Sequence, residues 1–416
     1  MNKILICGNK RLNGGIDVQG SKNAALPIIA ATVLNGEESI LTNCPDLKDV
    51  RAALEIVNWL GGEASYQDNT AIVKVESVNK NEISDALMSS MRSSVLFLAP
   101  VLSRTKKAVI SYPGGCSIGL RPIDLHIKAF RQLGVMVEEI GGHLYCSMDK
   151  IKSGKVNLIF PSVGATENIM LLAAVSNAEV LILNAAREPE IVDLQNCLNG
   201  MGAKISGAGS ETIRIIGVEK LHNVQYNIMA DRIFAATVLC ATAACGGDVT
   251  LRNVNSEHLE LMLSMLLSAG CVVSYGKDYV RIKCDRRPVG LGKVMTSPYP
   301  GFPTDAQALF MSALLGAEGT TVFVENIFES RYKHVPELLK MGADIIVDGR
   351  LAVVSGSNFI QGASVEAMDL RGGAALIIAG LSAIGETTVT GLSHIDRGYE
   401  KIDETFAALG ASMKRV

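Results

Sequence analysis

The sequence predicts an α/β protein built from six repeated helix–sheet units, each with a buried helix. Three observations lead to this fold class. A pattern of helix end, apolar residue, glycine and strand hairpin recurs along the chain, its marker glycines lie 68 to 73 residues apart, and six further segments are apolar enough to be buried helices. A constant period of this size indicates a repeat architecture. The marker glycines are Gly61, Gly134, Gly202, Gly270, Gly342 and Gly410.

Each marker glycine is expected where a helix stops and the chain turns into a strand. A left-handed backbone at that position favours glycine, which has no Cβ, and the alternating residues that follow are typical of strands. A helix that is apolar around its whole circumference belongs in a core, and the helices before the marker glycines are amphipathic. The six buried helices are expected at 22–34, 92–104, 164–177, 231–245, 304–318 and 371–385.

The two ends of the chain suggest the domain organisation. The sixth unit stops at Val416 before its second hairpin strand, whereas residues 3–8 form an orphan strand, so we expect the two ends to pair. If three units make one domain, residues 20–229 form the first domain, and residues 1–19 with 230–416 form the second, closed by both termini. The crossings near residues 20 and 230 would then be hinges beside a cleft.

Composition excludes several classes of protein. The 416 residues are 48% hydrophobic and 19% charged, which excludes a disordered chain. A net charge of −3 argues against a nucleic-acid binder or a polybasic membrane protein. Nine cysteines without a C-x-x-C pair fit a reducing compartment, so a cytoplasmic location is expected. We expect neither a signal peptide nor a transmembrane helix, because the apolar runs are too short.

The buried helices begin with polar residues that do not suit a core. Helix N-termini offer unpaired N–H groups and a partial positive charge, so several such ends around a cleft make an anion site. Aspartates at these places are also ordinary N-caps, and both interpretations stay open. Lys22 and Arg92 oppose the helix dipole and need a compensating anion, which favours ligand binding. The polar starts are Lys22, Arg92, Ser162 with Thr166, Asp231 with Arg232, Asp305, and Asp369 with Arg371.

The loop PGGCSIGLRPIDLH at 113–126 places Cys116 among glycines and five residues before Arg121. A cysteine in an exposed loop beside a guanidinium has a lowered pKa and can act as an acid or a nucleophile. On this motif alone a purely structural role is equally open. The other eight cysteines lie in apolar strands or helices, where each is expected to be a small buried hydrophobe. The sequence contains no zinc motif and no dinucleotide-binding fingerprint.

Five motifs together resemble one enzyme family. They occur in order across nearly the full length as GSKNAALP (20–27), PGGCSIGLRPIDLH (113–126), PSVGATENIM (161–170), PGFPTDAQA (300–308) and DLRGGAAL (369–376). This combination is similar to the UDP-N-acetylglucosamine 1-carboxyvinyltransferases, or UDP-N-acetylglucosamine enolpyruvyl transferases, of the EPSP synthase superfamily. The resemblance implies an inside-out α/β barrel with two domains, each of three repeated helix–sheet units with buried helices.

The resemblance also implies a reaction. The enolpyruvyl group of phosphoenolpyruvate moves to the 3′-hydroxyl of UDP-N-acetylglucosamine, and phosphate is released by addition and elimination through a tetrahedral intermediate. In the family this transferase reaction is the first committed step of peptidoglycan synthesis, and so of cell wall biogenesis. The resemblance implies no metal and no organic cofactor. It implies a covalent phosphoenolpyruvate adduct on Cys116 and makes fosfomycin the expected covalent inhibitor of that cysteine.

Site residues are carried over from the same resemblance. Phosphoenolpyruvate has a phosphate and a carboxylate, so several cations must hold it. The implied catalytic residues are Cys116 as general acid, Asp305 as hydrogen-bond partner and base of the 3′-hydroxyl, Lys22 and Arg397. Those implied for phosphoenolpyruvate are Lys22, Asn23, Arg92, Arg121 and Arg397. Those implied for the nucleotide sugar are Asn23, Arg92, Arg121, Pro122, Ile123, Asp124, Leu125, Ser162, Val163, Gly164, Asp305 and Ile327.

Two expectations concern how this site works. Asp369 and Arg371 are implied to support a closed state in which the Cys116 loop covers the substrates. A carboxylate beside several cations is expected to stay ionised, which suits Asp305 as an acceptor but limits its basicity.

The chain departs from the family pattern in two segments. Phe234 and Ala236 stand where members commonly have Glu and Gly, and Phe160 stands where some have Lys and others Leu. The first departure is expected either to alter packing beneath the cleft or to mark a paralogue with changed specificity.

Three alternative functions share some of these sequence features. A 5-enolpyruvylshikimate-3-phosphate synthase shares the fold and the phosphoenolpyruvate chemistry, but the Cys116 loop and the RPIDLH run argue against it. A DNA sliding clamp also repeats a helix–sheet unit, but its lumen needs an excess of basic residues. A catalytically silent paralogue that senses a nucleotide sugar stays open.

Overall fold

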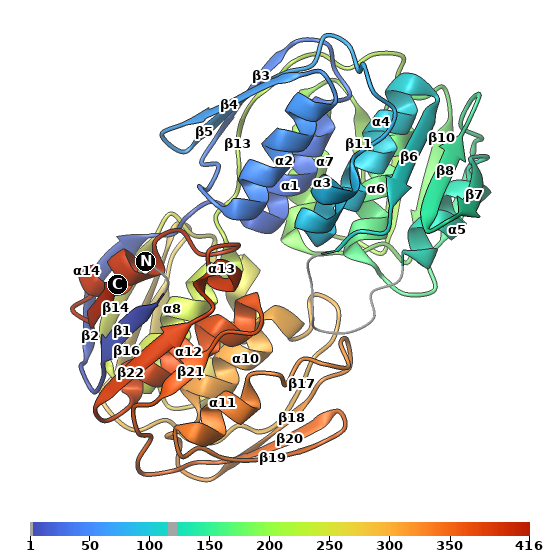
Figure 1. Ribbon diagram of the computed structural model, residues 1–416. Helices are drawn as coiled ribbons and strands as arrows, with labels where there is room; N and C mark the ends of the chain where they lie inside the picture. Colours follow the sequence, from blue (N-terminus) through green and yellow to red (C-terminus); the bar gives the residue numbers. More distant parts are fainter. Residues whose placement is uncertain (1–2, 115–122) are drawn as a thin grey trace. The chain divides into compact units, whose positions relative to one another are not determined.

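The structure, a computed structural model, describes residues 3–114 and 123–416. Within these residues the chain forms two compact units, drawn in Figure 1. The 20–229 unit comprises residues 20–114 and 123–229, and the 230–416 unit comprises residues 3–19 and 230–416. Each unit has a hydrophobic core of its own. The predicted site residues Cys116, Arg121 and Pro122 lie outside the described residues.

The 20–229 unit contains three sheets, in the strand orders β13-β3-β5-β4, β6-β8-β7 and β11-β12-β10-β9. Its elements are α1 (Lys22–Thr32), β3 (Glu38–Thr42), α2 (Lys48–Trp59), β4 (Glu63–Gln67), β5 (Thr70–Lys74), α3 (Asp85–Ser90), the short helix η1 (Arg92–Phe97), α4 (Leu98–Thr105), β6 (Lys107–Ser111), α5 (Asp124–Gln132), β7 (Met136–Ile140), β8 (His143–Ser147), β9 (Gly154–Asn157), α6 (Val163–Ala174), β10 (Glu179–Leu183), α7 (Pro189–Gly200), β11 (Lys204–Ser206), β12 (Thr212–Ile216) and β13 (Gln225–Asn227).

The 230–416 unit also contains three sheets, in the orders β15-β16-β14-β2, β17-β18-β20-β19 and β21-β22-β1-β23. Its elements are β1 (Ile4–Cys7), β2 (Leu12–Asp17), α8 (Arg232–Cys245), β14 (Gly247–Arg252), the short helix η2 (Ser256–Leu259), α9 (Glu260–Ser268), β15 (Val272–Tyr275), β16 (Tyr279–Cys284), β17 (Gly292–Met295), α10 (Thr304–Ala313), β18 (Thr320–Val324), α11 (Val335–Lys340), β19 (Asp344–Asp348), β20 (Leu351–Ser355), β21 (Ser364–Glu366), α12 (Leu370–Ser382), β22 (Glu386–Thr390), α13 (Leu392–Ile395), α14 (Ile402–Ala408) and β23 (Ser412–Arg415).

The apolar helices lie inside each unit and the sheets lie outside, which confirms the predicted inside-out α/β barrel. In the 230–416 unit the three helices α8, α10 and α12 pack against one another in every pair (Figure 1). Nearly all of their residues are buried. A helix that is apolar on every side is removed from water only when other elements surround it. The sheets therefore cover these helices from outside.

The predicted helix at 92–104 is present, but it consists of two kinds of helix. Residues 92–97 form the 3-10 helix η1, and α4 follows it directly from Leu98. Pro100 lies in the first turn of α4. A proline has no N–H to donate, so it is tolerated in a first turn and disfavoured in the interior of a longer helix. The change from η1 to α4 therefore places Pro100 where its missing hydrogen bond is not needed.

All six marker glycines have a positive φ, between +81° and +101°. This confirms the prediction that each one ends a helix with a left-handed backbone. At Gly270 nothing lies within 4 Å of the place that a Cβ would occupy. The backbone angle, not a lack of space, therefore favours glycine at this position.

The last sheet of the 230–416 unit uses both ends of the chain. Strand β1 pairs antiparallel with β23, with Ile4 opposite Arg415, and on its other edge with β22, with Ile4 opposite Val389. The first described strand is therefore central in a sheet otherwise made by the last fifty or so residues. No helix in the described part of the chain is long and apolar enough to cross a membrane.

Candidate active site

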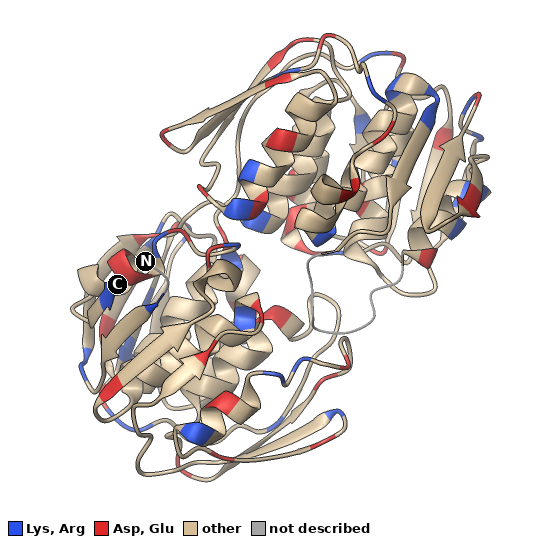
Figure 2. Ribbon diagram, viewed as in Figure 1, with Lys and Arg blue, Asp and Glu red and all other residues tan. Residues whose placement is uncertain are grey.

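Each core helix of the 230–416 unit carries one charged residue, at its first or second position. These residues are Arg232 on α8, Asp305 on α10 and Arg371 on α12. Figure 2 shows the remaining lengths of these helices without charge, while both signs are mixed elsewhere. A charge at the edge of an apolar core is costly unless it is paired or functional, so these helix starts are the first place to look for a site.

Asp305 is held at both carboxylate oxygens by buried guanidinium groups. Its Oδ1 accepts a hydrogen bond of 2.6 Å from Nη2 of Arg331, and its Oδ2 accepts from Nε and Nη2 of Arg371 at 3.2 and 3.1 Å. Both arginine side chains are 3% exposed, whereas the Asp305 side chain is 30% exposed. Two cations favour the charged carboxylate, so Asp305 presents an ionised and accessible acceptor.

Arg371 is fixed from its backbone as well as from its side chain. Asp369 is the N-cap of α12, and its Oδ1 accepts from the backbone N–H groups of Arg371 and Gly372, both at 3.0 Å. Burial disfavours the charged guanidinium, but the adjacent Tyr399 and Asp305 outweigh it, so the pKa of Arg371 is raised. Arg371 is therefore a permanent cation beside Asp305.

Glu325 links the segment that carries Ile327 to the start of α10. Its Oε1 accepts from the backbone N–H of Ile327 at 2.8 Å and from the Thr296 hydroxyl at 2.9 Å, and its Oε2 accepts from the Thr304 hydroxyl at 3.0 Å. Glu325 is 1% exposed. Ile327, which the family resemblance assigns to the sugar, is thus held close in space to Thr304, the residue before Asp305.

The other predicted residues of this unit lie at helix starts and turns. The Oδ1 atom of Asp231 accepts from the N–H groups of Ile233 and Phe234 at 2.8 and 3.0 Å. This confirms the interpretation of Asp231 as an N-cap. Arg397 lies in the turn after α13, two residues before Tyr399. Tyr399 accepts a hydrogen bond from Arg371, so the Arg397 turn is anchored beside α12.

In the 20–229 unit, Lys22 is the first residue of α1 and already has an anion from the protein. Its Nζ donates to Oδ2 of Asp49 on α2 at 3.2 Å, and the two side chains are 12% and 5% exposed. We expected the cation at this helix start to need an anion from a ligand. Asp49 supplies at least part of that charge, so the position of Lys22 by itself does not require a ligand.

Two further predicted residues begin helices of the same unit. Asn23 is the second residue of α1, which is capped by the Ser21 hydroxyl. Arg92 begins η1, and its Nη1 donates to the carbonyl of Pro113 at 3.3 Å. Arg92 therefore contacts the beginning of the loop motif in which Cys116 stands.

The predicted nucleotide-sugar residues at the starts of α5 and α6 are brought together through His126. A Cβ on Gly164 would lie 3.1 Å from Cε1 of His126, so the α6 backbone approaches the His126 ring closely. His126 Nδ1 in turn pairs with the Asn168 amide at 2.9 Å. The segments Ile123–Leu125 and Ser162–Gly164 are thus neighbours, with Ser162 as the N-cap of α6.

Sequence reasoning missed several residues that contact the predicted ones. Asp49, Glu325 and Arg331 lie away from the buried helix starts, and no local pattern distinguishes them from surface charges. Glu167 on α6 was also missed: burial, reinforced by Glu190 and Glu188, raises its pKa well above the usual range. A charged residue inside the apolar run 163–174 was the one available signal.

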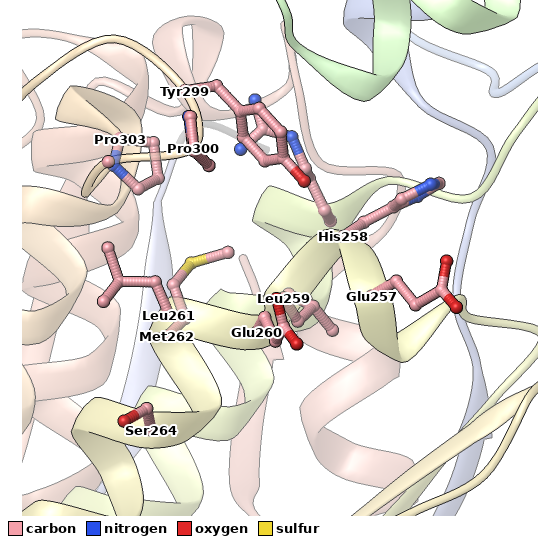
Figure 3. Close-up of a pocket in the computed structure, with 12 residues that line it drawn as sticks. Glu257, His258, Leu259, Glu260, Leu261, Met262, Ser264, Tyr299, Pro300 and Pro303 are labelled. Atoms are coloured by element: carbon pink, nitrogen blue, oxygen red, sulfur yellow. The ribbon is translucent and has the colours of Figure 1, made fainter. Parts of the chain in front are cut away.

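A pocket of about 370 Å³ lies in the 230–416 unit (Figure 3). Tyr299, Pro300 and Pro303 of the loop before α10 line one side, and the turn from η2 into α9, with His258, lines the other. Arg232, one of the polar helix starts singled out from the sequence, lines this pocket, whereas the described site residues that the family resemblance implies do not. In the same described part of the chain, no group of three or more His, Cys, Asp or Glu residues is placed to hold a metal ion.

Comparison with known proteins gives consistent results. The model of the EPSP synthase (3-phosphoshikimate 1-carboxyvinyltransferase) family matches residues 6–406. UDP-N-acetylglucosamine 1-carboxyvinyltransferase 2 of Caldanaerobacter subterraneus subsp. tengcongensis is 49% identical, and the match covers 100% of both chains. UDP-N-acetylglucosamine 1-carboxyvinyltransferase of Geobacter metallireducens is 44% identical, again over 100% of both chains.

Solved structures show the same fold at lower sequence identity. The enolpyruvyl transferase NikO from Streptomyces tendae has a TM-score of 0.89 and 24% identity, and the match covers 99% of this chain and 98% of NikO. EPSP synthase from Acinetobacter baumannii has a TM-score of 0.76 and 20% identity, over 100% and 99% of the two chains.

Proposed function

The chain belongs to the EPSP synthase family, and on this premise we propose that it transfers the enolpyruvyl group of phosphoenolpyruvate to the 3′-hydroxyl of UDP-N-acetylglucosamine. UDP-N-acetylglucosamine is proposed as the acceptor because the chain matches, over its full length and at 49% identity, a relative named UDP-N-acetylglucosamine 1-carboxyvinyltransferase 2. The reaction releases phosphate and is the first committed step of peptidoglycan synthesis.

Asp305 is the proposed hydrogen-bond partner of the sugar 3′-hydroxyl. Each carboxylate oxygen offers two acceptor sites, so Asp305 can accept a hydroxyl while both arginines stay bound. Its 30% exposure leaves the carboxylate accessible. The two guanidinium groups make protonation unfavourable, so Asp305 orients and polarises the hydroxyl more readily than it retains a proton.

Phosphoenolpyruvate is the proposed ligand of Lys22, Asn23, Arg121 and Arg397, with Arg92 contributing positive charge. A doubly anionic substrate competes well for Lys22 with the single carboxylate of Asp49, because charge-assisted contacts to phosphate are strong. In this proposal Asp49 keeps Lys22 oriented before the substrate arrives. No metal or organic cofactor takes part.

Cys116 is the proposed general acid for the substrate methylene carbon and the residue that forms a covalent adduct with phosphoenolpyruvate. Fosfomycin is its proposed covalent inhibitor. The residues at 123–125 and 162–164, which are neighbours in the structure, are proposed to contact the nucleotide part of the acceptor, together with Arg121 and Pro122. Arg371 supports the substrate-bound state by holding Asp305, and Asp369 supports it by capping α12 at the Arg371 backbone.

The proposal is tested by phosphate release from phosphoenolpyruvate with each of two acceptors. We expect release with UDP-N-acetylglucosamine and none with shikimate 3-phosphate. Cys116→Ala is expected to lower the rate at least about 100-fold, the usual scale for loss of a positioned acid. Cys7, which the sequence predicts to be buried, is exposed in the structure, so that prediction is wrong for this cysteine. Because Cys7 lies outside the proposed site, Cys7→Ala serves as the matched control.

Release with shikimate 3-phosphate in place of the nucleotide sugar would identify the sister activity named in the family description. No release with either acceptor, together with saturable binding of UDP-N-acetylglucosamine, would indicate a silent paralogue.

A further inference from the structure

A line of hydrogen bonds runs from the proposed catalytic carboxylate into the core of the 230–416 unit. Arg371, which holds Oδ2 of Asp305 through Nε and Nη2, donates from Nη1 to the Tyr399 hydroxyl at 3.2 Å. The Tyr399 hydroxyl lies 2.9 Å from Oγ1 of Thr237 on α8. Oγ1 of Thr237 donates to the carbonyl of Ile233, one helical turn earlier, at 2.8 Å.

One assignment of donors and acceptors satisfies every polar group in this line. A guanidinium group can only donate, so the Tyr399 oxygen accepts from Arg371. The single hydroxyl proton of Thr237 is used on Ile233, so Thr237 accepts from Tyr399. Tyr399 therefore accepts a hydrogen bond from Arg371 and donates one to Thr237 on α8.

The line is completely enclosed. Arg371, Tyr399 and Thr237 are 2%, 1% and 1% exposed. The ring of Phe234, a residue by which this chain departs from the family pattern, lies 6.3 Å from the Tyr399 ring, centroid to centroid. Tyr399 thus has a packed ring that holds its position and a hydroxyl that sets the rotation of the Arg371 guanidinium.

We propose that Tyr399 is a positioning residue for the transfer reaction, acting through Arg371 to hold the Asp305 carboxylate in its reactive orientation. The inference rests on the proposed function. A guanidinium anchored by one edge on Asp305 and by Nη1 on Tyr399 is prevented from turning. Without the hydroxyl, a buried donor loses its acceptor, and the guanidinium must rotate or shift to find another. Asp305, which shares that guanidinium, then loses its fixed orientation.

The test is Tyr399→Phe, which keeps the ring and removes only the hydroxyl. We expect kcat for phosphate release to fall about 10- to 100-fold, the scale of one charge-assisted hydrogen bond, with KM for both substrates changed less than about 3-fold. Thr237→Val is expected to lower kcat in the same direction by a smaller factor, and Thr237→Ser to restore most of that loss, because serine keeps the acceptor.

Tyr332→Phe is the matched control for a merely structural effect. Tyr332 is 8% exposed, and its hydroxyl lies 3.2 Å from each of two backbone carbonyls of the same unit, those of Phe323 and Arg350, as acceptors for its one proton. Its loss is expected to lower the thermal midpoint as Tyr399→Phe does, while kcat stays within about 2-fold of the wild type.

A double-mutant cycle with Arg371→Lys separates action through Arg371 from independent effects. Lysine cannot contact Asp305 and Tyr399 together in the same geometry, so Tyr399→Phe should then change kcat less than about 2-fold. Equal kcat losses in Tyr399→Phe and Tyr332→Phe, or full additivity with Arg371→Lys, would overturn the inference. A wild-type protein that releases no phosphate with the nucleotide sugar would overturn the proposed function and this inference with it.

Discussion

His334 is a buried titratable residue near Asp369, the N-cap of α12, and near Arg331, which holds Asp305. It is 2% exposed, and burial lowers its pKa to about 4, with Arg331 acting in the same direction and Asp369 opposing it. An unfolded histidine has a pKa of about 6.5. The folded protein thus keeps His334 neutral at pH values where the unfolded chain already binds a proton.

The sign of the resulting pH dependence follows from linkage. As pH falls from 6.5 towards 4, the unfolded state takes up the proton and the folded state does not, so stability is lost. Between pH 7.5 and pH 5 we expect the His334 contribution to the unfolding free energy to fall by about 2 kcal/mol.

Urea unfolding of the wild type and of His334→Asn at pH 7.5 and pH 5 measures the His334 contribution to the unfolding free energy. The variant should lose about 2 kcal/mol less than the wild type over that range, whatever its absolute stability. An identical loss in both proteins would show that His334 does not carry the effect.

At the scale of elements, the ends of helices decide where each repeat turns into strands. Six glycines perform this role, and their positive φ values follow from local chain geometry alone. The pattern of apolar residues located the buried helices for the same reason, since a helix without a polar face must be enclosed. The segment 92–104 is helical as predicted, with its first part as η1 and the rest as α4.

The Gly270→Ala variant measures how much the left-handed backbone at a marker glycine contributes to stability. Gly270 has φ of +91° and open space around its Cβ position, so alanine would meet strain without a clash. We expect a loss of about 1–2 kcal/mol in unfolding free energy. Gly316 also has open space but no left-handed backbone, so Gly316→Ala should stay within about 0.5 kcal/mol of the wild type. Equal effects in the two variants, measured by chemical denaturation, would contradict this account.

At the scale of the whole molecule, the chain is divided into two units with separate cores, and one sheet depends on residues from opposite ends of the sequence. Strand β1 supplies Ile4 and Ile6, both 0% exposed, to the core of the 230–416 unit. It also satisfies the facing backbone groups of β22 and β23. Strand β1 can pair with β22 and β23 only after the rest of the chain has been synthesised.

Deletion of residues 1–7 should therefore destabilise the 230–416 unit while the 20–229 unit stays folded. The loss removes two buried isoleucines, each worth about 2–5 kcal/mol by truncation, and leaves two strand edges unpaired. Hydrogen exchange should show fast exchange in β22 and β23 and unchanged protection in α1 and α6. A synthetic peptide of residues 1–9 added in excess should restore protection, and the same peptide with Ile4 and Ile6 replaced by Asp should not. Unchanged exchange after the deletion would contradict the central role of β1.

By itself the sequence determined the α/β class, the six-unit repeat, the helix-ending glycines and the single charges at the starts of the core helices. These features follow from short-range rules of periodicity, φ and capping. Only the tertiary structure decided which charges meet. Asp305 is 26 residues from Arg331 and 66 from Arg371, and Lys22 is 27 from Asp49. No local pattern specifies such pairs, because side-chain direction and packing across separate helices select the partner of each buried charge.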